Sequence, residues 1–538
     1  MRPSYTAHMR SISRRGFIAR SGAALAALPL IRSVDALAQV ANPVFRHGVA
    51  SGDPLSDRVI LWTRVTPKEA GGAQRVSWVL ARDPRLAQVV TRGELETGAA
   101  RDFTVKVDAI GLAPGTPYYY RFESLGERSA IGRTRTLPAS GVSQLRLGVV
   151  SCSNLPQGYF NAYACLANRA DLDAIIHLGD YIYEYKNETY GDGRKYGRVP
   201  MPDREIVALQ DYRERHAQYK ADPDSQEVHR QHPFIVTWDD HELANNTWRA
   251  GAENHDSSEG EWSARRRAAV QAYYEWMPIR EDAQTLQDRI YRSFRFGNMA
   301  TLFMLDTRLV GRDQEVPRED TTTIELPNRQ LLGAEQEGWL AEQLVTSVRN
   351  ESRWSVFGQQ VMFAPQAEKG VRASNPDSWD GYRAARGRVF DMIERAKMDN
   401  LCVLTGDVHS SWAYDLPRDP FRGYDKGTGK GSVGVEFAGT SVSSPSNLGR
   451  GPEGPKQLAD TLAARPHLHY VDGRYRGYFI VDMTRERLQA DFYAVATVEE
   501  RNTKERFETG FVTESGRNHL TKAATPAPRA PAPDPAPQ

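Results

Sequence analysis

The sequence has few cysteines, almost no net charge and no apolar run long enough to cross a bilayer. Three cysteines in 538 residues are an odd number, so a disulfide framework does not organise the fold. With 69 basic and 68 acidic residues the net charge is +1, which excludes a general attraction to nucleic acid or to an anionic membrane. Any attraction for an anionic substrate must therefore come from a local site.

The first 38 residues have the pattern of an export signal. Ser13–Ile18 is a twin-arginine motif, the apolar run Gly22–Ile31 is too short to span a membrane, and Ala36–Ala38 is a small-x-small cleavage site. We expect the twin-arginine export machinery to deliver a mature chain to the periplasm or outside the cell, without stable membrane insertion. A disordered basic tail is the alternative interpretation.

Residues 44–138 are predicted to form an all-β module. Short strand-like runs alternate with turn formers, and Leu112, Pro114, Thr116 and Tyr118 have the spacing of a tyrosine corner. This favours an immunoglobulin or fibronectin III-like β-sandwich. Such a module could bind carbohydrate or cell wall, but its loops concentrate no chemistry, which favours a packing role.

A change of pattern after Pro138–Gly141 predicts a second, α/β domain over residues 145–515. At 538 residues the chain exceeds what one hydrophobic core usually serves, so two domains are expected. Residues 523–538 are rich in Pro and Ala without an apolar period, which predicts a disordered tail.

Polar side chains able to bind metal follow four predicted strands of the α/β domain. A single Asp at such a place is usually a turn residue or a helix cap. Here Cys, Tyr, Asn and His are mixed with the carboxylates, and the carboxyl ends of neighbouring strands lie at a common edge. We therefore predict one metal site built from Cys152, Asp180, Tyr183, Asp240, Asn245, Asp407 and His409.

The donor types indicate two kinds of ion. Thiolate, phenolate and imidazole suit Fe3+, whereas carboxylate and amide oxygens suit Ca2+, with Mn2+ or Mg2+ as alternatives. Five ionised acids at one place require cations to balance them, which favours a dinuclear centre. Such a pair of ions supports attack of a metal-activated hydroxide on a phosphate ester.

His241 follows one of the predicted ligands directly and is the candidate catalytic residue. It could protonate the leaving oxygen. The alternative is that it holds Asp240 or Glu242 in place. Arg194, Arg198 and Arg204 lie after Tyr183 and are candidates for contacting the substrate phosphate, although an exposed Arg is more often only a solvated charge.

Several motifs in order resemble the PhoD-like alkaline phosphatases and phosphodiesterases, which belong to the calcineurin-like and purple acid phosphatase-like metallophosphoesterases. The resemblance extends to about Ala494. The motifs are His47–Pro54, Leu61–Arg64, Ser151–Ser153, Gly179–Tyr183, Trp238–Glu242, Asn245–Asn246, Leu305–Arg308, Gly358–Met362 and Gly406–His409.

The resemblance implies a catalytic domain of two packed sheets flanked by helices (αββα), preceded by the β-sandwich. It also implies Fe3+ held by Cys152, Asp180, Tyr183 and His409, with Asp180 bridging and Ca2+ near Asp240, Asn245 and Asp407. The family often has a C-terminal helix that caps the site, whereas this chain ends in a Pro-rich segment.

We therefore predict an exported, metal-dependent phosphoric ester hydrolase that cleaves phosphomonoesters and phosphodiesters. Its partners would be small phosphate esters or phosphodiester polymers, with no nucleic acid specificity, and a monomer is expected. One alternative is a phospholipase D-like or teichoic acid phosphodiesterase of the same fold. An alternative from another class is a non-catalytic surface protein that binds the cell wall.

Overall fold

The computed structural model describes residues 42–68, 71–281, 289–371 and 373–537. The predicted export signal lies outside these residues. Within them, the strands predicted from apolar runs are present with small shifts at their ends. The run Leu145–Val150, for example, is a strand over the same residues. The position of the site depends on two large sheets, on the helices that cover them and on an N-terminal sandwich.

The first large sheet has ten strands in the described part of the chain. Ile175 and Ile176 show why its central strands form here, because these β-branched neighbours point to opposite faces and both are fully buried. In sheet order the strands are β22 (Thr521–Ala523), β21 (Glu505–Glu514), β20 (Arg487–Val495), β19 (Gly477–Met483), β9 (Leu145–Val150), β10 (Ala174–His177), β11 (Pro233–Val236), β1 (Val49–Gly52), β2 (Arg58–Arg64) and β5 (Thr104–Ile110).

The second large sheet has seven strands in the described residues and packs face to face on the first. The layer between the sheets contains Leu147 and Ile176 from the first sheet and Leu302 and Val356 from the second. In sheet order its strands are β12 (Arg292–Phe296), β13 (Ala300–Met304), β14 (Trp354–Gln359), β15 (Leu401–Thr405), β17 (Ser432–Ala438), β16 (Ser411–Pro417) and β18 (Leu468–Asp472).

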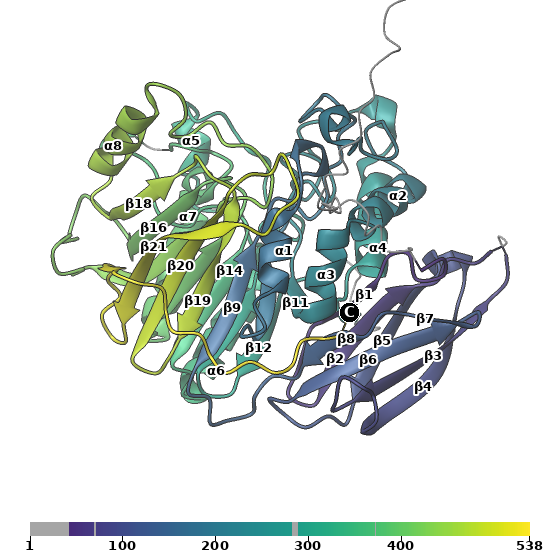
Figure 1. Ribbon diagram of the computed structural model, residues 1–538. Coiled ribbons are helices and arrows are strands. Elements are labelled where there is room, and N and C mark those ends of the chain that lie inside the picture. Colours follow the sequence, from purple (N-terminus) through teal and green to yellow (C-terminus); the bar gives the residue numbers. More distant parts are fainter. Residues whose placement is uncertain (1–41, 69–70, 282–288, 372, 538) are drawn as a thin grey trace, which may run out of the picture. The chain divides into compact units, whose positions relative to one another are not determined.

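Helices cover the outer face of each sheet, which completes the predicted αββα sandwich (Figure 1). The first sheet is covered by α1 (Asn161–Ala167), α2 (Leu209–Lys220), α3 (Pro223–Gln231) and α4 (Trp262–Trp276). The second is covered by α6 (Ala334–Arg349), α7 (Arg383–Arg395) and α8 (Gly454–Ala464), with a short α5 (Thr321–Ile324) in a connecting segment. Among the described helices, none has the length and apolar content that crossing a membrane requires.

The N-terminal module is a β-sandwich, as predicted, but it shares a sheet with the catalytic part. Its own sheet contains β3 (Gln74–Ala81), β4 (Val89–Thr97), β6 (Pro117–Ser124), β7 (Glu127–Arg128) and β8 (Gly132–Arg135), and it packs on β1, β2 and β5. Since β1 pairs in parallel with β11, the connection near residue 138 does not separate two sheets. The tyrosine corner is present: the Ala113 amide donates a 2.8 Å hydrogen bond to the Tyr118 hydroxyl.

The C-terminal segment differs from the disordered tail predicted from its composition. It lies along the first sheet and ends beside β8 (Figure 1), where the amide of Ala536 donates to Gln231. Its backbone carbonyls accept hydrogen bonds from Arg146 at Pro528 and from Tyr119 at Asp534. Extended Pro-rich backbone has no partner of its own, so side chains of the sandwich satisfy it. Within the described residues no helix follows α8, and thus none of the described C-terminal residues forms a capping helix.

Candidate metal centre and active site

The predicted ligands lie at the carboxyl ends of strands from both large sheets. Cys152 and Asp180 follow β9 and β10 of the first sheet, whereas Asp407 and His409 follow β15 of the second. The site is therefore at the junction of the two sheets, not along the edge of a single sheet as the sequence had suggested. Packing of the sheets face to face brings both edges to one place.

Four of these residues have left-handed backbone conformations that non-glycine residues rarely adopt. The φ angles are 62° at Cys152, 56° at Asp180, 63° at Asp407 and 52° at His409. Each such residue costs about 1 kcal/mol or more, and residues of this kind cluster at functional sites. These four residues lie in tight turns a few residues beyond the ends of their strands. The turns direct the four side chains into one space.

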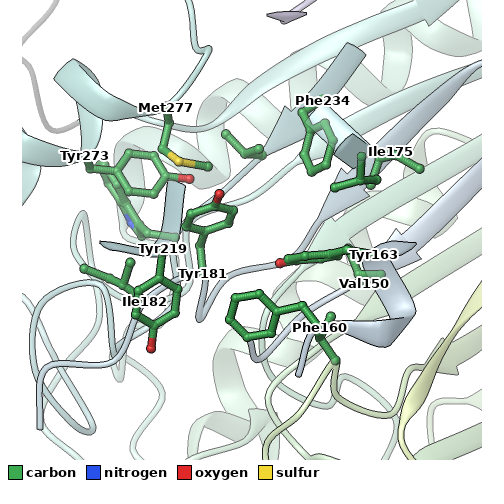
Figure 2. Packing of buried hydrophobic residues seen from close by; sticks show 14 of the residues in the cluster. Val150, Phe160, Tyr163, Ile175, Tyr181, Ile182, Tyr219, Phe234, Tyr273 and Met277 are labelled. Atoms are coloured by element: carbon green, nitrogen blue, oxygen red, sulfur yellow. The ribbon is translucent and has the colours of Figure 1, made fainter. Parts of the chain in front are cut away.

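Core packing holds the turn after β10 in place. Tyr181 is buried among aromatic and aliphatic side chains that include Tyr163, Tyr219 and Phe234 (Figure 2). Its neighbour Asp180 therefore faces the site while Tyr181 anchors the backbone on the opposite side. Gly179 is needed here, because a Cβ would lie 2.5 Å from the Cβ of Asp239 on the adjacent strand end.

The first group of ligands surrounds Asp180. A thiol sulfur of Cys152, a carboxylate oxygen of Asp180 and a ring nitrogen of His409 lie within 4.8 Å of one another. The Tyr183 hydroxyl is 2.9 Å from Asp180 Oδ2 and 3.3 Å from His409 Nε2, and it accepts a 2.7 Å hydrogen bond from Ser444. Thiol, phenol, carboxylate and imidazole thus converge as predicted.

The second group contains the carboxylates of Asp239, Asp240 and Asp407, which also lie within 4.8 Å of one another. Asp180 belongs with Asp240 and His241 in a further group of the same size. Asp180 therefore stands between the two groups, which is where a bridging carboxylate would be.

Arg308 is the cation that the chain itself supplies to this centre. Its fully buried guanidinium lies 2.5 Å from Asp239, 3.3 Å from Asp407 and 3.4 Å from Asp240. It also pairs with Asp377 at 2.7 Å. This role of Arg308 was not predicted from the sequence, although the residue lies in a motif that carries the family resemblance.

The centre contains more buried acid than the chain neutralises. Among the described residues, Asp180 Oδ1 and Asp239 Oδ2 are buried without a hydrogen-bond partner, and no Arg or Lys forms an ion pair with Asp180. A buried carboxylate oxygen without a partner costs several kcal/mol, and metal ions are one of the few groups that remove this cost. The residues therefore fit hard and borderline cations, which accept the oxygen, nitrogen and sulfur donors present here.

The pKa shifts reflect the same imbalance. Burial raises the pKa of the Cys152 thiol and of the Tyr183 hydroxyl well above their ordinary values, and the Asp180 carboxylate raises both further. Burial and then Asp377 raise the pKa of Asp407 to about 7. Burial also acts to raise the pKa of Asp240, but Arg308 and His241 outweigh it and lower that pKa to about 2.

His241 is oriented by a carboxylate different from the two considered in the sequence analysis. Its Nδ1 is 2.7 Å from Glu184 Oε2, and its ring packs on Tyr183 at 4.3 Å between centroids. Burial acts to lower the pKa of His241, yet Glu184, Asp240 and Asp180 together raise it well above its ordinary value. Because Glu184 occupies Nδ1, the imidazole has Nε2 free to act as a proton donor.

Glu242 holds the backbone of the turns. Its carboxylate accepts hydrogen bonds from the amides of Asp180 at 2.9 Å, Tyr181 at 2.5 Å and Asp239 at 2.8 Å. One buried side chain thus joins the ends of β10 and β11. This role could not be recognised from the sequence, because it depends on the register between these strands.

Asn245, which is also a predicted ligand, and the three arginines proposed to contact phosphate all have side-chain contacts with nearby acids. The Asn245 side-chain amide donates to Glu253, and the Asn246 backbone amide is the group that contacts Asp240. Each of the three arginines forms an ion pair with an acid outside the metal groups: Arg194 with Glu188 and Asp192, Arg198 with Asp222, and Arg204 with Asp211.

Family models match two parts of the chain. The model for PhoD-like phosphatase matches residues 147–492, and the model for the PhoD-like phosphatase N-terminal domain matches residues 32–138. These two matches follow the division between the αββα sandwich and the N-terminal module.

Two individual proteins resemble the chain over most of its length. Alkaline phosphatase D of Bacillus subtilis (strain 168) is 38% identical over 546 residues, which cover 96% of this chain and 90% of that protein. A solved structure of PhoD is 36% identical with a TM-score of 0.81, covering 91% of this chain and 94% of the other. The chain therefore belongs to the PhoD-like phosphatase family and is a phosphoric ester hydrolase.

Proposed function

We propose that this hydrolase uses a mixed Fe3+ and Ca2+ centre to cleave phosphomonoesters and phosphodiesters. The observation that carries the proposal is the convergence of Cys152, Asp180, Tyr183 and His409 on one point. Thiolate and phenolate together favour a ferric ion, and the carboxylates beside them favour a hard divalent ion such as Ca2+, Mn2+ or Mg2+. When bound, such a pair supplies a water of lowered pKa and positive charge for the phosphoryl oxygens.

Side chains of the protein supply the other functions that the reaction needs. Asp180 lies between the two groups of ligands and would be shared by both ions. Arg308 holds Asp239 and Asp407 in place through ion pairs of 2.5 and 3.3 Å. His241, oriented by Glu184, would donate a proton to the leaving oxygen. Tyr183 and Tyr190 pack beside His241 and help to fix the position of its ring.

Metal analysis combined with visible absorption tests the centre. Purified protein should contain iron and one or more divalent ions, and a ferric phenolate or thiolate should give it colour. Cys152→Ala and Tyr183→Phe should each lose iron, the absorption band and most activity. A colourless, iron-free and fully active enzyme would refute the iron assignment.

The substrate range is tested separately with a nitrophenyl monoester, the corresponding bis-ester and phosphatidylcholine. We expect turnover of the first two at neutral to alkaline pH. A preference for the lipid by orders of magnitude would instead favour a phospholipase D-like enzyme. Export by the twin-arginine route also remains a prediction, and replacing Arg14 and Arg15 by Lys should retain the protein in the cytoplasm.

A further inference from the structure

A second cluster of metal-binding side chains lies away from the active site. Asp415, His469 and His519 each offer one ligand atom, and these three atoms lie within 4.8 Å of one another. Asp415 is four residues beyond Ser411, the first residue of β16, which places it about 13 Å along the strand from the end near His409. None of the three residues takes part in the proposed reaction.

The local backbone directs these side chains toward each other. Between β16 and β18, Ala413 is opposite Tyr470 and Tyr414 is opposite Leu468, so His469 is the extra residue of a β-bulge. Bulges re-aim a side chain and are common beside functional sites. His519 comes from the turn between β21 and β22, and the loop at Gly429 packs so closely that a Cβ there would lie 2.4 Å from the Cβ of His519.

One of the two distances in the cluster matches a tetrahedral ion. His469 Nε2 is 3.3 Å from Asp415 Oδ1, whereas His519 Nδ1 is 2.6 Å from Asp415 Oδ2, a direct hydrogen bond that a bound ion would replace. Ligands of a tetrahedral zinc ion with bonds of 2.0–2.1 Å stand about 3.3 Å apart. Among the described residues, none forms a well-aligned hydrogen bond with the buried His469 Nε2, so this nitrogen is available to an ion.

The surroundings complete such a site. The Tyr424 hydroxyl donates to Asp415 Oδ2 at 2.8 Å and the Leu520 amide donates to Oδ1 at 2.9 Å, so the carboxylate is oriented from outside the cluster. His469 also lines a cleft of about 370 Å³ together with Asp472 and Lys522. The cluster thus lies beside this cleft through His469.

We propose that Asp415, His469 and His519 bind one Zn2+ ion per chain, separate from the active-site ions. The ion would connect two sheet edges, because β18 is the outer strand of the second sheet and the β21–β22 hairpin is the outer pair of the first. Two imidazole nitrogens and one carboxylate oxygen are donors that zinc accepts. Binding requires the His519 tautomer with its proton on Nε2.

Zinc content of the untagged full-length chain tests the proposal. After incubation with Zn2+ and desalting, His469→Gln and His519→Gln should each contain about one equivalent less zinc than wild type, with equal iron. His467→Gln is the control: His467 lies on the same segment and is more buried than His469, but its Nε2 is 2.8 Å from the Pro365 carbonyl and it is not part of the cluster. Zinc should also raise the Tm of wild type and of this control, but not that of the other two variants.

A measurement on wild type alone covers the case in which the variants do not fold. Anomalous scattering at the zinc edge from a Zn2+-soaked crystal should show a peak bonded to His469 Nε2, His519 Nδ1 and Asp415. Anomalous density confined to the active site, or equal zinc in all folded variants, would show that the cluster is only a hydrogen-bonded contact and would overturn the proposal.

Discussion

Buried charge lies at both ends of the first sheet, and the two ends balance it differently. At the start of β9, Arg146 pairs with Asp171 at 3.0 Å and Asp482 at 2.7 Å, and Arg487 pairs with Asp482 at 3.0 Å. Two carboxylates therefore meet two guanidinium groups. The charges in this cluster balance without any ligand, and its role is structural.

At the other end of the same strands the carboxylates outnumber the cations. Within the described residues, Arg308 and Arg312 are the arginines paired with Asp239, Asp240, Asp377 and Asp407, and Asp180 has no ion pair with Arg or Lys. Burial of charge alone therefore does not identify a site. An excess of one sign does, here with a buried carboxylate that no Arg or Lys neutralises.

Replacing Asp180 by Asn should have the largest effect. The substitution removes the carboxylate shared by the two ligand groups, so we expect kcat/KM to fall about 1000-fold and metal content to drop. Steady-state kinetics and metal analysis measure both. Asp171→Asn at the opposite end is the control, and it should lower stability while leaving the metal content unchanged. If Asp171→Asn lost metal and Asp180→Asn kept it, the assignment of the metal site to the Asp180 end of the sheet would be wrong.

Replacing Arg308 by Gln should mainly affect stability. A buried carboxylate that loses its only cation typically costs about 3 kcal/mol, and Asp239 would be in this position. Denaturant unfolding of the metal-free protein measures the change, because no ion then replaces the lost guanidinium. The exposed Arg204, which pairs with Asp211, is the matched control, and Arg204→Gln should change the free energy of unfolding by less than about 0.5 kcal/mol. Similar values for both would contradict a special role for Arg308.

Replacing His241 by Asn should reduce kcat about 100-fold for alkyl phosphates and much less for nitrophenyl phosphates, whose leaving group needs no proton. Glu184→Gln should have an intermediate effect, because it removes the hydrogen bond that orients the imidazole. An equal loss on both substrates would indicate that His241 only positions Asp240.

Removing the ions with a chelator should make the stability of the protein fall as pH rises. In the metal-free protein the pKa of Asp407 is about 7, above its ordinary value of 3.8. The folded state then binds more protons than the unfolded chain between about pH 4 and pH 7, so stability falls as pH rises by about 1.4 kcal/mol per pH unit for each such group. With ions bound, the carboxylate is held deprotonated and this fall should disappear. Unfolding curves at several pH values, with and without chelator, measure the difference.

Deleting residues 524–538 should have the smallest effect. Arg146 loses the Pro528 carbonyl and the buried Ala527 and Ala536 lose their contacts, so we expect a loss of about 2 kcal/mol with unchanged kcat. Thermal unfolding and a nitrophenyl phosphate assay measure the two quantities. A large loss of activity would mean that this end of the sheet also influences the site.

Much of the site could be predicted from local patterns. Cys152, Asp180, Tyr183, Asp407 and His409 each stand directly after an apolar run, and the αββα layers follow from the motifs that carry the family resemblance. The prediction for Asn245 as a ligand stays a prediction: its side-chain NH2 donates to Glu253, eight residues further along the chain, and its amide oxygen is the atom that would bind an ion. Composition alone was misleading for the C-terminal segment, because side chains of the sandwich supply the hydrogen bonds that its prolines cannot.

The sequence by itself determined which chemical groups stand at the strand ends, since apolar periodicity and the residues that follow it are local properties of the chain. The tertiary structure decided which of these groups meet. It placed Asp407 and His409 of one sheet against Asp180 of the other, supplied Arg308 and Glu242 from separate segments, and brought Asp415, His469 and His519 together. Such contacts join residues far apart in the chain, and their geometry depends on sheet packing and register that no local pattern encodes.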